Sequence, residues 1–170
     1  MCPHSNGPAP IPTHTVQTAG EETIMSSSKP RTIALILGIA VVLAIAIQFA
    51  PTPVSRINPP VQAEPQWDSP ATREMFYRAC GDCHSNQTSW PWYSRVAPVS
   101  WLIASDVAEG RQRLNVSEWN RPQRGADEAA EVVAEGEMPL PIYLIMHPDA
   151  RLSTAERQAL ALGLQASFAK

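Results

Sequence analysis

The hydrophobic positions of this chain form one long apolar run followed by several short amphipathic segments. Residues 33–50 contain a single polar side chain, Gln48. As an α-helix the run would span about 27 Å, close to the roughly 30 Å hydrocarbon core of a bilayer. It therefore predicts one transmembrane helix that stays attached as an anchor. A cleaved signal peptide is the first alternative, but the run is longer than the usual hydrophobic region of a signal peptide. A buried core helix is the second, but the rest of the chain has no matching hydrophobic excess.

The segments that flank this run predict its orientation. Residues 1–28 show no periodicity and are expected to be a disordered tail or a start-site artefact, with Met25 as the alternative start. Lys29 and Arg31 precede the apolar run, and only Arg56 stands close behind it. Basic residues stay on the cytoplasmic side. We therefore expect a single-pass protein of the cytoplasmic membrane, with its C-terminal part on the periplasmic side.

A proline-rich segment separates the predicted anchor from the rest of the chain. Residues 51–65 contain five prolines, and we expect residues 51–66 to form an extended, semi-stiff linker. At about 3.1 Å per residue, this spacer would let the domain stand up to roughly 45 Å from the membrane. Residues 67–170 then have the length of one folded domain.

Within residues 67–170 the apolar periodicity favours helices, and no segment alternates as a strand would. Four helices are expected: from Ser69-Pro70 to about Cys80, over residues 99–113, over residues 126–135, and from Ser153 onwards. The first begins with an N-cap followed by proline, and the last begins with a capping box. Leu160, Leu164 and Phe168 form an apolar stripe on the last helix, which we expect to pack against Phe76 of the first. The predicted fold class is all-α, a small helical domain.

Composition narrows the function classes. The chain has 170 residues and a formal net charge of −3, so it shows no basic excess that would suggest binding to nucleic acid. It has three cysteines, Cys2, Cys80 and Cys83, too few for a disulfide framework.

The pentapeptide Cys80-Gly81-Asp82-Cys83-His84 is the C-x-x-C-H pattern of covalent c-type haem attachment. Two thiols at this spacing add to the two vinyl groups of one porphyrin edge, and the adjacent imidazole reaches the iron as proximal ligand. Three other interpretations are weaker. A thioredoxin-like dithiol lacks its strand–helix context. Half a zinc site lacks a second cysteine pair. A structural disulfide is the third alternative.

The second axial ligand has several candidates. The domain offers Met75, Met138, Met146 and His147. Met138 lies between a predicted helix and a proline-rich loop, far enough along the chain from His84 to reach the opposite haem face. Met75 lies in the helix before the motif and is more readily a core residue. Met138 is therefore the favoured ligand, with His147 or an open sixth position as alternatives.

Aromatic and charged residues add two hypotheses. The five tryptophans of the domain would be core residues or would line a haem pocket and donate to propionates; they are Trp67, Trp90, Trp92, Trp101 and Trp119. Three arginines could pair with a propionate: Arg95, Arg111 and Arg113. An acidic run is either a solvated helix face or a docking patch for a basic redox partner; it comprises Asp127, Glu128, Glu131, Glu135 and Glu137.

Across residues 67–165 a set of motifs occurs together: Cys80 to Tyr93, Ala97 to Trp101, Asp106 to Arg111, Leu114 to Trp119, Met138-Pro139, Tyr143-Leu144 and His147-Pro148. This set resembles the bacterial haem-binding domain family of cytochrome-c-like proteins. The resemblance implies a compact helical cytochrome-c-type fold with one covalent haem, exported and often membrane-anchored. It implies Cys80 and Cys83 as attachment points, His84 as proximal ligand and Met138 as distal ligand.

These observations predict a one-haem electron carrier, tethered to the membrane and serving redox partner proteins there or in the periplasm. The alternative is a haem-based sensor or ligand-binding module with an open or labile sixth position. An enzyme such as a peroxidase is disfavoured, because the sequence shows no obvious distal His–Arg pair for acid–base chemistry.

Overall fold

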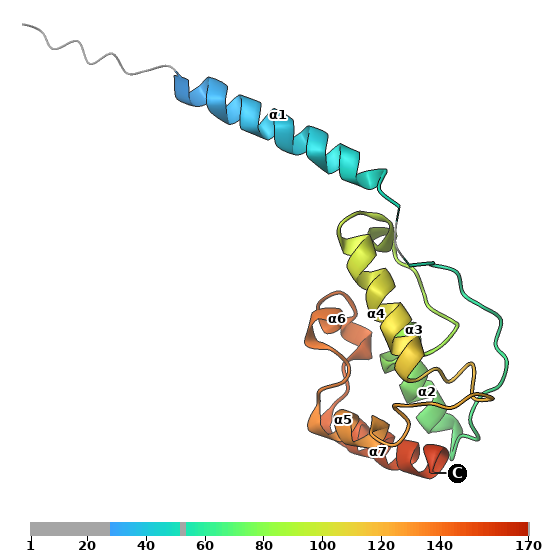
Figure 1. The fold of residues 1–170 in the computed structure, drawn as a ribbon. Coiled ribbons are helices and arrows are strands. Elements are labelled where there is room, and N and C mark those ends of the chain that lie inside the picture. The colour runs from blue at the N-terminus through green and yellow to red at the C-terminus, as the bar shows by residue number, and fades with distance from the viewer. Residues whose placement is uncertain (1–27, 52–53, 170) are drawn as a thin grey trace, which may run out of the picture. The chain divides into compact units, whose positions relative to one another are not determined.

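The computed structural model describes residues 28–51 and 54–169, and their regular structure is helical (Figure 1). The elements are α1 (Ser28–Gln48), α2 (Pro70–Ala79), α3 (Gly81–His84), η1 (Trp92–Arg95), α4 (Val99–Arg113), α5 (Ala129–Glu135), α6 (Pro141–Met146), η2 (Pro148–Ala150) and α7 (Thr154–Phe168). The described residues contain one isolated β-bridge, Ala63 to Glu118, and no strand. The predicted all-α class is confirmed. The predicted tail, with Met25 and Cys2, lies outside the described residues.

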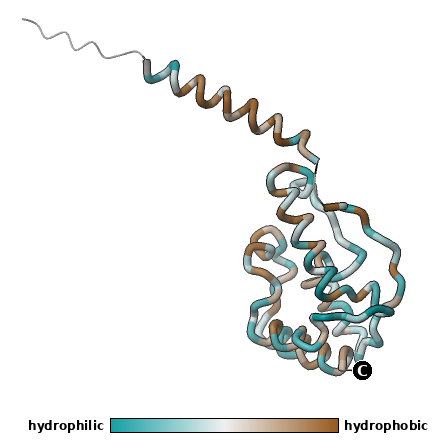
Figure 2. Tube along the Cα trace, viewed as in Figure 1, coloured by the Kyte–Doolittle hydropathy of each residue, from teal (hydrophilic) through white to brown (hydrophobic). Residues whose placement is uncertain are grey.

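Helix α1 is the one described helix long and apolar enough to cross a membrane. Its span Lys29–Gln48 has a mean hydropathy of 2.3, and Figure 2 shows it as a nearly continuous hydrophobic stretch. Its side chains are exposed, for example Ile36 and Leu43. This exposure disagrees with the alternative of a buried core helix.

Local capping signals set the ends of the domain helices. The Ser69 side chain accepts a hydrogen bond from the backbone N–H of Thr72 at the start of α2. The capping box at Ser153 and Glu156 begins α7. Both features, and the bounds of α4, match the sequence predictions. Helix α5 begins at Ala129 rather than Ala126. Before it the chain forms turns, in which the backbone N–H groups of Ala126 and Ala129 each donate to the carbonyl three residues earlier. Helices α3 and α6 were not predicted, since elements of four and six residues are too short to show a period.

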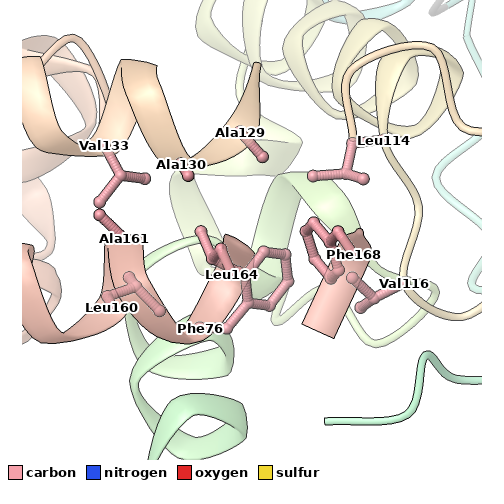
Figure 3. Packing of buried hydrophobic residues seen from close by; sticks show 10 residues of the cluster. All are labelled: Phe76, Leu114, Val116, Ala129, Ala130, Val133, Leu160, Ala161, Leu164 and Phe168. Carbon is pink, nitrogen blue, oxygen red and sulfur yellow. The ribbon is translucent and has the colours of Figure 1, made fainter. Parts of the chain in front are cut away.

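The hydrophobic core lies where α2, α5 and α7 meet (Figure 3). Phe76 of α2 and Phe168 of α7 are in edge-to-face contact, with ring centroids 6.3 Å apart, and Leu160 and Leu164 are almost fully buried. The predicted packing of the first domain helix on the last is therefore confirmed. A Cβ added at Gly163 of α7 would collide with the Thr72 side chain, so glycine permits this close approach.

The proline-rich segment from residue 56 onwards is hydrogen-bonded to the domain, whereas an extended, semi-stiff spacer that holds the domain off the membrane was expected. Arg56 Nη1 donates to the carbonyl of Ser94 at 2.6 Å, and the Asn58 amide donates to the carbonyl of Thr88. The backbone N–H of Ala63 donates to the Ser117 carbonyl, and Pro65 is buried. Proline content favours an extended backbone but does not prevent its other groups from pairing with a neighbouring surface. The free length is therefore much shorter than the predicted 45 Å.

Candidate functional site

The C-x-x-C-H motif occupies the junction between α2 and α3. Cys80 ends α2, its backbone N–H donating to the Phe76 carbonyl, and it also precedes the first residue of α3. The His84 backbone N–H donates to the Cys80 carbonyl at 3.0 Å, which closes a single helical turn. This turn places both thiols and the imidazole within one short stretch of backbone. The preceding helix α2 is anchored in the hydrophobic core through Phe76.

These three side chains line one cavity together with residues from α4 and from the loop before α6. The lining residues are Ala79, Cys80, Cys83, His84, Asp106, Glu109, Gly110, Arg113, Met138, Pro139, Leu140 and Tyr143. The predicted attachment points, proximal ligand and favoured distal ligand are thus brought together, although Met138 lies more than fifty residues after His84 in the sequence.

The imidazole of His84 is oriented by backbone carbonyls. Its Nδ1 lies 3.0 Å from the Leu114 carbonyl oxygen and 3.2 Å from that of Gly110. Carbonyls only accept, so Nδ1 carries the proton and Nε2 keeps its lone pair for a metal. Burial lowers the pKa of His84, which also favours this neutral, ligating form.

A glycine makes this arrangement possible. A Cβ on Gly110 would lie 2.6 Å from the Cys83 carbonyl oxygen, so α4 reaches α3 at backbone contact. The same glycine supplies one of the two carbonyls near His84 Nδ1.

Both cysteines of the motif are free thiols. Burial raises the pKa of Cys80 to about 12 and that of Cys83 to about 11. A redox-active dithiol has a depressed thiol pKa instead. The environment therefore disagrees with a thioredoxin-like role, and the absence of a bond between the sulfurs disagrees with a structural disulfide.

Met138 is directed to the cavity by the end of α5. Gly136 terminates that helix in the left-handed conformation, with φ of 81°. The chain then turns back, and the backbone N–H groups of Glu137 and Met138 both donate to the Val132 carbonyl. Glycine is favoured here because other residues adopt this φ only with strain.

Comparison with known families agrees with this geometry. A family model described as a haem-binding domain matches residues 42–166. The chain belongs to the haem-binding domain family. No curated protein and no solved structure matches it.

The donor set of this haem-binding domain fits a haem better than a bare metal ion. Within residues 28–51 and 54–169, no three His, Cys, Asp or Glu side chains are grouped as a metal site. Half a zinc site at Cys80 and Cys83 therefore has nothing to complete it. A largely apolar cavity with one neutral imidazole and one thioether suits an iron whose other ligands come from a porphyrin.

The alternative axial ligands of the haem-binding domain are placed elsewhere. The Nε2 of His147 lies 3.1 Å from the Tyr93 hydroxyl, and its Nδ1 lies 3.0 Å from the Tyr143 carbonyl. Both ring nitrogens are thus engaged. Met146 is 56 % exposed, and Met75 packs against the core. Of the four candidates, Met138 alone lines the cavity.

Of the two interpretations of the tryptophans, the core fits Trp67 and Trp119, and none of the five lines this cavity. Trp67 and Trp119 stack around Phe168 in the core, with centroids 5.9 and 4.6 Å away. The Trp90 indole donates to Asn58, and Trp92 is exposed. Large aromatic rings stabilise a fold most where they are buried in the core, which is where Trp67 and Trp119 lie.

Tyr143 is the aromatic residue of the cavity, and it was singled out beforehand by the family resemblance alone. Its hydroxyl donates to Asp82 Oδ2 at 2.8 Å, inside the C-x-x-C-H motif. Burial and this hydrogen bond raise the pKa of Tyr143, so the phenol stays neutral. Its ring stacks on His147, with centroids 3.9 Å apart. Tyr143 thereby connects the loop that carries Met138 to the motif.

The charged groups at the cavity are Asp106, Glu109 and Arg113 of α4. Burial, and the nearby charge of Glu109, raise the pKa of Asp106. Arg113 is the one proposed propionate partner that lines the cavity. Arg111 instead binds the Ser85 carbonyl and the Thr88 hydroxyl, and so holds the loop after the motif.

Proposed function

We propose that this haem-binding domain carries one haem c, attached through Cys80 and Cys83, and acts as a membrane-anchored electron-transfer protein. The observation that supports it is the convergence of both thiols, the His84 imidazole and the Met138 thioether on one cavity. When bound, the haem iron supplies a one-electron Fe(III)/Fe(II) couple, and no substrate bond is made or broken.

The chain's own residues would fix the iron's environment. Cys80 and Cys83 hold the porphyrin edge, so the cofactor cannot dissociate during repeated cycles. The Leu114 and Gly110 carbonyls hold His84 in one tautomer and orientation. The Met138 thioether favours the reduced state more than a second histidine would.

The proposed location is the cytoplasmic membrane, with the domain on the periplasmic side. Support comes from the length and hydropathy of α1 and from the two basic residues before it. We propose redox proteins at the membrane or in the periplasm as partners. The exposed carboxylates of the acidic run around α5 are suited to a basic partner surface.

The test is a visible spectrum together with haem staining of the full chain isolated from membranes. Covalent attachment predicts that haem stays with the denatured polypeptide, and that Cys80→Ala with Cys83→Ala removes it while Cys2→Ala does not. Methionine ligation predicts a weak ferric band at the red edge of the spectrum and no CO binding after reduction. Rapid CO binding would favour the sensor or ligand-binding alternative. Haem lost on denaturation of the wild-type chain would contradict covalent attachment.

A further inference from the structure

One end of the domain presents apolar side chains to solvent. Around η1 and the first turn of α4, Trp92 is 75 % exposed, Leu102 50 %, Val99 44 % and Val96 43 %. Single exposed apolar residues are ordinary, but a contiguous group on one surface marks an interaction site. We call these four residues, together with Arg95, the η1 face.

The chain itself restricts where this face can lie. Helix α1 ends at Gln48, and Arg56 is already hydrogen-bonded to the Ser94 carbonyl within η1. Eight Cα–Cα steps separate these residues, and fully extended they reach at most about 29 Å. If α1 spans a bilayer, η1 is the part of the domain held within this distance of the membrane exit.

A cavity next to the η1 face has the chemistry of an anion site. Its lining includes Arg56, Arg95, Ser100 and Trp101 and no carboxylate. The indole N–H of Trp101 is buried and has no acceptor among the described residues. Ser100 and Trp101 belong to the first turn of α4, so the positive end of this helix dipole lies here, although their backbone N–H groups already donate to the Val96 and Pro98 carbonyls. An oxygen-rich anion would satisfy the indole N–H and pair with the arginines.

We propose that the η1 face rests on an anionic lipid surface, with a headgroup phosphate bound between Arg56, Arg95 and the Trp101 indole. The exposed Trp92 suits this place, because tryptophan concentrates where hydrocarbon meets headgroups. Apolar side chains flanked by basic ones are the composition of an interfacial surface. This inference rests on the membrane anchoring in the proposed function.

Such docking would set the height of the haem. The η1 face includes Val99 at the start of α4, whereas Gly110 near the other end of this helix approaches His84. At 1.5 Å per residue, these positions are about 16 Å apart along the helix. The cofactor would then be held at a defined distance above the membrane surface, within reach of membrane-bound partners, rather than moving freely on a tether.

The experiment uses the full haem-loaded chain in phospholipid vesicles, with a nitroxide on an introduced cysteine in a Cys2→Ser background. Val96→Cys places the label on the η1 face. Leu162→Cys is the control, since Leu162 is an exposed apolar residue on α7, 68 % exposed against 43 % for Val96. Figure 1 shows α7 and the start of α4 at opposite ends of the domain. Accessibility of the label to oxygen and to a water-soluble nickel chelate is measured in vesicles with and without phosphatidylglycerol.

In vesicles containing phosphatidylglycerol, we expect the residue-96 label to be several-fold more accessible to oxygen than to the chelate, and the residue-162 label to show the reverse. Arg95→Gln or Trp101→Phe should weaken the immersion of residue 96. Equal, water-like accessibility at both positions would overturn the proposal while leaving the anchor and the haem intact. Shielding of residue 96 from both reagents would also overturn it, because a protein partner or second copy would then cover this face. Haem protein that fails to sediment with the vesicles would overturn the anchor itself.

Discussion

At the residue scale, the candidate site depends on how a few polar atoms are paired. His84 is poised to ligate because its Nδ1–H donates a hydrogen bond to the Leu114 carbonyl, and Tyr143 is held because its hydroxyl donates to the Asp82 carboxylate. Neither pairing is visible in the motif. Each joins residues that are 30 or 61 positions apart in the sequence. Buried polar groups need such partners, so removing the Asp82 carboxylate should release the Tyr143 hydroxyl, whereas the Leu114 carbonyl belongs to the backbone and persists in any variant.

The first prediction concerns the distal ligand. Met138→Ala should leave the covalent haem in place but remove the sixth ligand, because Met138 is the candidate thioether that lines the cavity. The red-edge ferric band should disappear, and CO should bind after reduction. Met146→Ala, at an exposed position, is the control and should leave the spectrum unchanged. An unaltered spectrum in Met138→Ala would rule out this ligand.

The second prediction concerns acid stability. Arg73, Trp67 and Tyr77 all donate to the Glu64 carboxylate. The hydrogen bond from Arg73, above all, lowers the pKa of Glu64 to about 2. Since the folded-state pKa is below the unfolded value, this stabilisation is present above about pH 4.5 and is lost as the pH falls towards 2.

Glu64→Gln should therefore lower the free energy of unfolding by about 1–2 kcal/mol near neutral pH and by little near pH 2. The expected loss is small for a doubly bonded ion pair because the Arg73 side chain is 45 % exposed, and solvent screens its interaction with Glu64. Chemical unfolding of the wild-type and variant chains in detergent, at both pH values, measures this loss in the free energy of unfolding. Glu74→Gln, at an exposed position on α2, is the matched control. An equal loss for Glu64→Gln at both pH values would contradict the assigned ionisation.

At the element scale, two close helix contacts hold the domain together. Helix α4 meets α3 at Gly110, and α7 meets α2 at Gly163 and Phe168. The first contact supports the motif, and the second closes the core behind it. Short helices are unstable alone in water, so the motif's single turn depends on both contacts.

The third prediction tests the contact between α3 and α4. Gly110→Ala should destabilise the fold by about 1–3 kcal/mol, because the added Cβ would meet the Cys83 backbone oxygen at 2.6 Å. Haem loading and the axial-ligand spectrum should change with it. Gly125→Ala is the control, since its Cβ would meet its nearest neighbour, the Arg113 oxygen, at 3.4 Å. Thermal unfolding of both variants makes the comparison, and equal stability would show that α4 can move away without cost.

The fourth prediction tests the contact between α2 and α7. Phe168 is 7 % exposed and packs against three aromatic rings, so Phe168→Ala should cost about 3–5 kcal/mol. Its position in the last turn of α7 favours the lower end of this range. Leu162→Ala, on the exposed side of the same helix, should cost almost nothing. Denaturant unfolding gives the free energy of unfolding of both variants. If Phe168→Ala lowers it no more than Leu162→Ala does, the C-terminal turn of α7 is frayed.

At the scale of the whole molecule, membrane topology decides whether haem can be attached. The fifth prediction is that haem-staining protein sediments with membranes and that protease added to spheroplasts digests the domain. Lys29→Gln with Arg31→Gln should lower the haem-loaded fraction, because these residues supply the orientation bias. As a control, a cytoplasmic marker protein must survive the protease, which shows that the spheroplasts are intact. Protected haem protein would contradict the orientation, and soluble periplasmic protein would show a cleaved signal.

The sequence by itself determined what depends on neighbouring residues. The apolar run, the caps at Ser69 and Ser153 and the C-x-x-C-H spacing all act within a few positions along the chain. They were sufficient for the anchor-like helix, the main domain helices and the all-α class. Together with the distributed motifs, they also led to the haem-binding family.

Tertiary structure decided what depends on chain reversals. Four residues were candidates for the distal ligand, and the turn at Gly136 brought Met138 to the cavity while His147 was paired elsewhere. Trp67 and Trp119 entered the core and Trp92 stayed on the surface, and the proline-rich segment found hydrogen-bond partners on the domain. Residue type states which interactions a side chain can make. Which of them it makes depends on the groups that long-range packing places beside it, because buried polar and apolar surfaces must all find partners at once.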